Sequence, residues 1–156
     1  MSTKYTEGPL ELDLPEHWGA TRLSRNLVIL HDKDEFHKGE DPSLLREGVT
    51  VRRLAHSADE SLEERARKEM RRLVRQGEPE YRVDALGSLD AQVYEWTDGS
   101  MHLISWFVDP TPDDYFRLDY GTRDPKVTAA RLRERAADVL SRIEWHVATA
   151  RSPSGV

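Results

Sequence analysis

At 156 residues and 18.0 kDa, the chain has the length of one domain and can bury a single, modest core. Its formal net charge of -6 and pI of about 5.5 argue against nucleic acid or anionic lipid as a partner, because such binding needs clustered Lys and Arg. The absence of cysteine excludes disulfides, thiolate metal sites and a cysteine nucleophile.

The composition also sets the expected domain limits and compartment. Four Trp, five Tyr and three Phe are too many for a disordered chain, so we expect one folded domain over residues 1–147. Residues 148–156 are rich in Ser, Pro and Gly and are expected to form a disordered tail. The first residues lack the apolar run of a signal peptide, and no segment reaches the roughly 18 apolar residues of a membrane span. We therefore expect a cytoplasmic protein with no integral membrane segment.

Three strands are predicted before the first helix. Residues 10–14 alternate apolar and polar side chains up to Pro15, which predicts a strand with one buried face. Residues 26–30 form a short apolar run, which predicts a buried strand that leads into a charged loop. Residues 48–54 alternate again, and we expect this third strand to pair with the second.

A first helix is predicted over residues 61–76. Ser61 and Glu64 have the spacing of a capping box, and apolar residues repeat at helical intervals until Gly77, a natural stop.

A strand-rich region follows, in which turn residues separate short apolar stretches. The strands are expected at 81–86, 91–96, 101–108 and 115–120. Asp98-Gly99 is the strongest hairpin signal, typical of a type I′ turn. Short connections between consecutive strands predict an antiparallel meander.

The last elements are a helix and a short strand. Asp124 is predicted as the N-cap, Pro125 as the first helical residue, and the apolar stripe continues to Ile143. Residues 144–147 are predicted to form a short edge strand. Together the elements predict an α+β fold in which an antiparallel meander sheet is packed with two main helices.

The strand at 101–108 suggests where a partner binds. Both of its alternating sets are apolar, so both faces of the sheet must be covered, either by the two helices or by a helix and the N-terminal arm. The alternative is that one concave face, with Trp96 and Trp106 on it, receives an apolar ligand or partner segment. A charged side chain on a strand must also be paired, at an edge or directed at a partner. The predicted partner-binding residues are Trp96, Ile104, Trp106, Val108 and Arg52.

No motif in the sequence indicates catalysis. There is no Gly-x-Ser-x-Gly elbow, phosphate-binding glycine loop or dinucleotide fingerprint, and the six His lack metal-ligand spacing. The best candidate cluster lies in a charged loop that is more simply solvated, and its members are His31, Asp32, Asp34, Glu35 and His37. We expect no enzyme activity, no catalytic residue, no metal and no cofactor.

The order of these segments resembles the DcrB/PsbP-like domain family over roughly residues 8–146. The segments that carry the resemblance are Leu14-Pro15-Glu16-His17-Trp18, Val49-Thr50-Val51-Arg52, Ser61-Leu62-Glu63-Glu64, the stretch from Leu86 to Trp96, and Ile143-Glu144-Trp145. The chain departs from the family at Asp90-Ala91, where a Gly-Gly or Gly-x pair is usual. The resemblance implies a PsbP-like fold and, for the branch of type VI secretion effector chaperones, a sheet face that holds an apolar helical segment of a client.

Three functions remain open from the sequence. The first is a chaperone or adaptor that shields an apolar helix of a client effector. The second is an immunity protein that blocks a toxin with the acidic loop at 32–40. The third is a small-molecule carrier or enzyme with a pocket between the sheet and the second helix. The sequence also allows a homodimer, formed through the edge at 144–147 or through an apolar sheet face.

Overall fold

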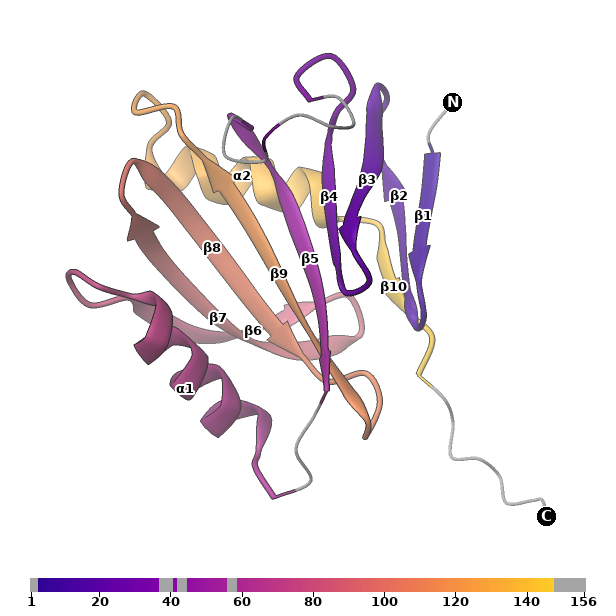
Figure 1. The fold of residues 1–156 in the computed structure, drawn as a ribbon, viewed down its shortest axis with the longest axis vertical. Helices are drawn as coiled ribbons and strands as arrows, with labels where there is room; N and C mark the ends of the chain where they lie inside the picture. The colour runs from indigo at the N-terminus through magenta and orange to yellow at the C-terminus, as the bar shows by residue number, and fades with distance from the viewer. Residues whose placement is uncertain (1–2, 37–40, 42–44, 56–58, 148–156) are drawn as a thin grey trace.

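The computed structural model describes residues 3–36, 41, 45–55 and 59–147. The described chain contains ten strands and two helices (Figure 1). The predicted α+β fold with a meander sheet and two main helices is confirmed. The tail predicted at 148–156 and much of the acidic loop lie outside the described residues.

A seven-stranded antiparallel sheet forms the centre of the fold. From one edge to the other its strands are β3 (Trp18–Ser24), β4 (Leu27–Asp32), β5 (Glu47–Ala55), β9 (Asp114–Thr122), β8 (Met101–Val108), β7 (Leu89–Asp98) and β6 (Glu80–Leu86). The predicted pairing of the second and third strands is the observed β4–β5 pair. The predicted meander is the run β6–β7–β8–β9, in which each strand pairs with the next.

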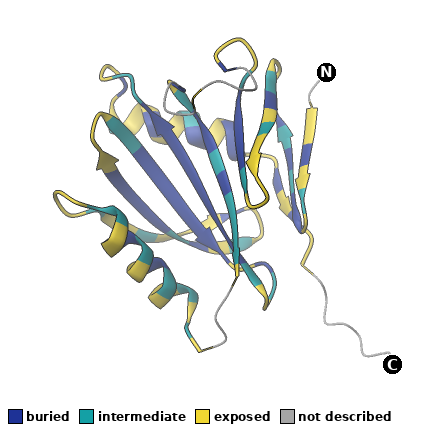
Figure 2. Cartoon of the chain, in the orientation of Figure 1, coloured by how far each residue is buried: buried dark blue, intermediate teal, exposed yellow. Residues whose placement is uncertain are grey.

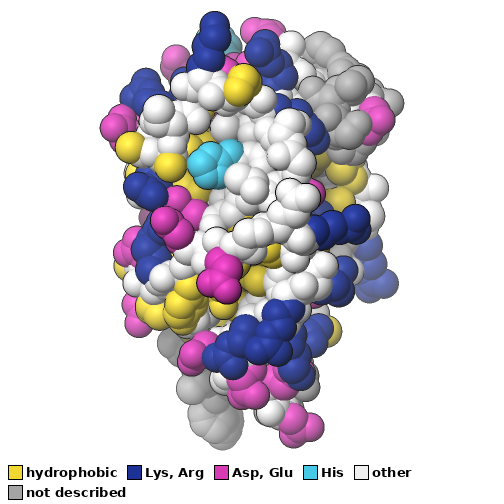
Figure 3. Space-filling model, turned by 90° about the vertical axis from the view of Figure 1, so that its left-hand side faces the viewer, with side chains coloured by type: hydrophobic (Ala, Val, Ile, Leu, Met, Phe, Trp, Pro, Cys, Tyr) yellow, Lys and Arg dark blue, Asp and Glu magenta, His cyan; other side chains and the backbone are white. Residues whose placement is uncertain are grey.

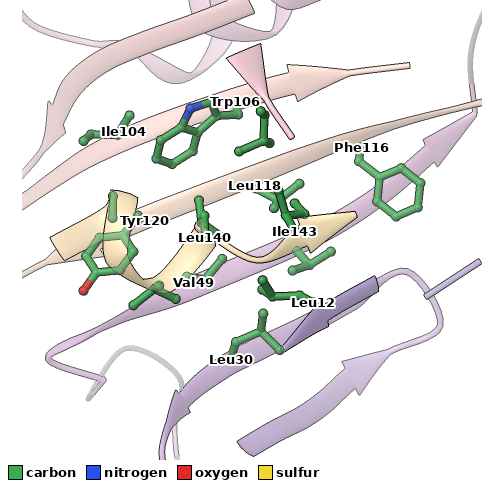
Figure 4. Close-up of a cluster of buried hydrophobic side chains, with 14 of the residues drawn as sticks. Leu12, Leu30, Val49, Ile104, Trp106, Phe116, Leu118, Tyr120, Leu140 and Ile143 are labelled. Carbon is green, nitrogen blue, oxygen red and sulfur yellow. The ribbon is translucent and has the colours of Figure 1, made fainter. Parts of the chain in front are cut away.

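A small three-stranded sheet lies against one face of the large one. It contains β1 (Thr3–Glu7), β2 (Leu10–Leu14) and β10 (Ile143–Trp145), in the order β1-β2-β10. Figure 4 shows Leu12 of β2 and Ile143 of β10 directed toward Leu118 and Val49 of the large sheet. The N-terminal arm and the C-terminal strand therefore close the main core together.

The helices cover opposite faces of the large sheet. Helix α2 (Ala129–Leu140) packs on the face that also carries the small sheet, through Leu132, Ala136 and Leu140. Helix α1 (Leu62–Leu73) packs on the other face, through Ala66 and Met70. Figure 2 shows the central strands buried while the outer surface of α1 is exposed. The expectation that the helices and the N-terminal arm cover both faces is confirmed.

The helix starts confirm one predicted cap and correct another. At α1 the Ser61 Oγ accepts a hydrogen bond from the Glu64 N–H at 3.1 Å, as the capping-box spacing predicts. The prediction that Asp124 caps α2 was wrong. Its carboxylate accepts from the Lys126 N–H, while Thr128 caps the helix by accepting from the Arg131 N–H at 3.1 Å. Two residues that can each serve as an N-cap stand four positions apart here, and the sequence signal chose the earlier one.

The turn between β7 and β8 lies one residue later in the sequence than predicted. Asp98 pairs with Met101, so the two loop residues are Gly99 and Ser100. Gly99 has a φ of +60° and Ser100 is not among the residues with positive φ, which fits a type II′ turn with glycine first.

Within the described residues, no helix is long and apolar enough to cross a bilayer. On the side of the molecule shown in Figure 3, Lys and Arg are interspersed with Asp and Glu, and hydrophobic side chains lie between them.

Candidate functional site

A groove of about 650 Å³ lies between α2 and the β6–β8 end of the large sheet. Its floor includes Ile104 and Trp106 of β8, and one wall is formed by Ala136, Ala137 and Leu140 of α2. Figure 4 shows Ile104 and Trp106 on the sheet and Leu140 on the helix above it. Small alanine side chains on this side of α2 leave the space that larger residues would fill. We call this cavity the α2 groove.

The three buried tryptophans differ in how their indole N–H groups are bonded. The Nε1–H of Trp96 donates to Ser105 Oγ, and that of Trp145 donates to the Leu86 carbonyl, each at 2.9 Å. Trp106 lines the groove and is 7% exposed, yet no acceptor for its indole N–H lies among the described residues. This nitrogen is not one of the fully buried atoms without a partner, so it reaches solvent. The unused N–H is therefore available to a carbonyl or another acceptor of a ligand.

A buried carboxylate holds the two arginines at the mouth of the groove. Glu95 lies on β7 with its side chain 5% exposed, and its Oε2 accepts from Arg82 Nη1 of β6 at 2.6 Å and from Arg133 Nε of α2 at 2.7 Å. Burial alone would raise the pKa of Glu95, but the hydrogen bonds from Arg133 and Arg82 outweigh it and keep that pKa below the usual value. Glu95 thus joins the sheet edge to the helix while charged.

We predict that Glu95→Gln destabilises the protein in a pH-dependent way. Because the folded pKa is lowered, the stabilisation by Glu95 is complete above its ordinary pKa of 4.5 and is lost as the pH falls through the folded value. Near pH 7 the variant should unfold about 2 kcal/mol more easily, since both arginines stay partly solvated. Urea unfolding at several pH values should show this gap shrinking below pH 4.5. A gap that is constant with pH, or as large for the exposed control Glu134→Gln, would contradict the assignment.

The opposite face of the sheet contains a polar network beneath α1. Trp96 Nε1 donates to Ser105 Oγ, which donates to Asp119 Oδ1 at 2.5 Å. Arg117 donates through Nε to Asp119 Oδ2 and through Nη1 to Glu69 of α1, both at 3.1 Å. The network is buried, and it links three strands to the helix.

Arg52 lies at the margin of this network. Its Nη1 is 3.8 Å from Asp119 Oδ2, beyond hydrogen-bonding distance, and this buried nitrogen has no hydrogen-bond acceptor among the described residues. Burial, together with the nearby Arg117, lowers the pKa of Arg52. A recess of about 200 Å³ adjoins it, lined in part by Trp96 and Met101. A charged residue on a strand can be ion-paired, lie at an edge or contact a partner. For Arg52 the geometry supports an ion pair with Asp119.

The predicted partner-binding residues do not share one surface. Ile104 and Trp106 lie in the α2 groove, while Val108 is on the same face but buried in the main core. Trp96 and Arg52 lie on the α1 face. The expectation that Trp96 and Trp106 share a face was wrong, because Trp96 pairs with Leu103 while Trp106 has the opposite orientation on the same strand.

The sequence reasoning also missed Arg82, Glu95 and Arg133. A signal was present at Glu95, a charged residue between two aromatics on a strand with apolar neighbours. Its second partner, Arg133, is 38 residues away in sequence and could not be inferred.

The described residues give little support for a metal. His31 hydrogen-bonds to Thr21 and to the Asp32 carbonyl, each at 2.8 Å, and His37 lies outside the described residues. Glu11, Glu144 and His146 come within 4.8 Å of one another on the surface of the small sheet. Glu11 already bonds His146 within that group and Lys4 outside it.

No protein family and no curated protein matches the chain. Twelve chains of solved structures match it, among them the following two. A protein of Bacteroides thetaiotaomicron aligns with a TM-score of 0.57 and 10% identity over 91% of this chain and 47% of that one, so this chain spans about half its length. LpqN, described as involved in cell envelope biogenesis of Mycobacterium tuberculosis, aligns with a TM-score of 0.49 and 13% identity over 92% and 90% of the two chains. At 10% identity the first likeness concerns the fold alone. The DcrB/PsbP-like resemblance stays a prediction.

Proposed function

We propose that this protein is a non-catalytic binding protein that holds an apolar segment of a partner protein in the α2 groove. The observation that carries the proposal is the unused indole N–H of Trp106 in a groove with an apolar floor. An apolar peptide segment offers both groups that such a groove receives, hydrophobic side chains and backbone carbonyls. Arg82 and Arg133 at the mouth suit an acidic group beside that segment.

The chemistry of the groove supports a binding role over a catalytic one. No histidine, tyrosine or cysteine lines it in the described part of the chain. Ser141 Oγ donates to the Asp138 carbonyl, and Glu95 is held charged by two arginines. General acid–base chemistry needs a group whose pKa lies near the working pH, and the lowered pKa of Glu95 takes this carboxylate further from it.

The finer form of the proposal is a cytoplasmic chaperone or adaptor for a secretion effector. It rests on the family resemblance in the sequence, with the groove as the place where the client's apolar segment would lie.

We predict that Ala137→Trp blocks the groove. Ala137 is exposed on α2 and lines the cavity, so a large side chain there should occupy the space without disturbing the core. The probe is 8-anilinonaphthalene-1-sulfonate, whose apolar rings and sulfonate match the floor and the arginines. In a fluorescence titration the variant should bind the dye about tenfold more weakly than the wild type, a change of about 1.4 kcal/mol.

The matched control is Ala130→Trp, which places the same side chain at an exposed position of α2 outside the groove. It should bind the dye like the wild type. Equal affinity in both variants would place the dye site elsewhere and count against the proposal.

A small-molecule carrier is the second candidate. The volume of about 650 Å³ lies within the roughly 300–1,000 Å³ that is usual for sites of small ligands. Native mass spectrometry of the protein from its own host distinguishes the two, since a retained polypeptide favours the adaptor and a retained small mass favours the carrier. The immunity alternative depends on a loop whose residues 37–40 lie outside the described residues, and it stays a prediction.

A further inference from the structure

Strand β6 is an edge of the large sheet and carries exposed apolar side chains. Within the described residues it pairs with β7 only. Tyr81 is 46% exposed and Val83 is 55% exposed, and both lie on the α1 face of this strand. An exposed edge with apolar side chains is a surface on which another strand can pair.

The register of the β6–β7 hairpin fixes which backbone groups are free. Leu86 pairs with Leu89 around the two-residue loop Gly87-Ser88, so this closing pair is hydrogen-bonded and every second residue back along β6 also bonds β7. Tyr81, Val83 and Ala85 therefore direct their N–H and C=O groups away from β7. The Ala85 N–H confirms this direction, because it donates to the Asp84 carboxylate at 2.9 Å instead of to β7.

We propose that β6 pairs antiparallel with β6 of a second copy of this chain, about a twofold axis at Val83. In this register Val83 meets Val83 of the other copy, and Tyr81 meets Ala85, through the backbone groups that point outward. Arg82 meets Asp84 of the other copy on the α2 face, and the same pair forms twice because the interface is symmetric.

The sequence of the edge is complementary to itself in this register. The direct pairing of Arg82 with Asp84 falls at a non-hydrogen-bonded position, where side chains on neighbouring strands are closest. Asp84 now accepts from its own neighbour, the Ala85 N–H. In the dimer the carbonyl of Tyr81 from the other copy takes that N–H and releases the Asp84 carboxylate for Arg82. On the other face the exposed Tyr81 and Val83 become covered.

The symmetry has a consequence for the grooves. Because the axis is perpendicular to the sheet, the two seven-stranded sheets become continuous and both α2 grooves open on the same face. Arg82 and Asp84 also line the α2 groove, so the dimer contact lies at the mouth of each groove. A single strand pair buries less than the roughly 1,200 Å² of a stable interface, so we expect a reversible dimer with a Kd on the order of micromolar.

The test is analytical ultracentrifugation of the full chain over a range of concentrations. The wild type should move from monomer to dimer as concentration rises. Arg82→Asp places two carboxylates opposite each other, and Asp84→Arg places two guanidinium groups opposite each other, so each variant should dimerise about tenfold more weakly or worse. In an equimolar mixture, one variant presents aspartate at both positions and the other presents arginine at both. Both cross-strand pairs are then of opposite charge again, and the dimer should be restored.

Controls keep the result interpretable. Arg131→Asp makes the same charge change on an exposed part of α2 and should dimerise like the wild type. Arg82 also bonds Glu95, so Arg82→Asp must be checked for folding by circular dichroism, whereas Asp84 is exposed and its variant should fold normally. The proposal is overturned by a wild type that stays monomeric at all concentrations, by a dimer that neither single variant weakens, or by a mixture that fails to dimerise.

Discussion

Replacing Asp119 by alanine should cause a larger loss of stability than removing any exposed charge of this protein. Asp119 accepts from Ser105 Oγ and Arg117 Nε, and its Oδ2 is also 3.8 Å from Arg52 Nη1. Without this carboxylate both guanidinium groups beneath α1 lose the negative charge that they share. Removing one partner of a buried ion pair typically costs about 3–5 kcal/mol, and we expect a loss in that range.

Urea unfolding of Asp119→Ala at pH 7 measures this loss. Asp119→Asn keeps the size and one acceptor, so its loss should be smaller. Asp90→Ala removes an exposed aspartate from strand β7 and should change stability by no more than about 0.5 kcal/mol. A cost for Asp119→Ala close to that of the control would mean that the network contributes nothing to stability.

Trp145→Ala should have a comparable effect by a different cause. Trp145 of β10 donates to the Leu86 carbonyl at 2.9 Å and packs edge-on against Phe116, with ring centroids 5.5 Å apart. It thereby fixes the small sheet to the β6–β7 hairpin, which forms the outer wall of the α2 groove. Truncating a buried aromatic side chain costs about 3–5 kcal/mol.

A second substitution separates packing from hydrogen bonding at this position. Trp145→Phe keeps a ring but leaves the Leu86 carbonyl without its donor, so we expect a loss of about 1–2 kcal/mol. Chemical denaturation of both variants gives the two values. If the two variants lost the same free energy, the ring packing against Phe116 would have no separate role.

Local periodicity predicted eight of the ten described strands. The alternation in residues 101–108 was right because successive side chains of a strand point to opposite faces wherever the strand is placed. Strands β1 and β3 were missed, since residues 3–7 and 18–24 carry few buried apolar side chains and pair mainly at sheet edges.

The candidate site was only partly predictable. The error at Trp96 was avoidable, because a two-residue turn in either register pairs Trp96 with an odd-numbered residue of β8, on the face away from Trp106. The α2 groove was not predictable in detail. It exists because α2 lies over β9 and presents Ala136 and Ala137 toward the sheet edge, a tertiary arrangement that local patterns do not encode. The third hypothesis expected a pocket between the sheet and the second helix, where the α2 groove lies; what it binds stays a prediction.

The most direct test of the binding role is to follow the tryptophan indole N–H signals by NMR during titration with 8-anilinonaphthalene-1-sulfonate. Trp106→Phe identifies the signal of Trp106 by its disappearance. If the α2 groove is the binding site, the Trp106 signal should shift progressively, while those of Trp96 and Trp145, already bonded to Ser105 and Leu86, should stay in place. A shift of the Trp96 signal with Trp106 unchanged would place binding on the α1 face and contradict the proposed role of the groove.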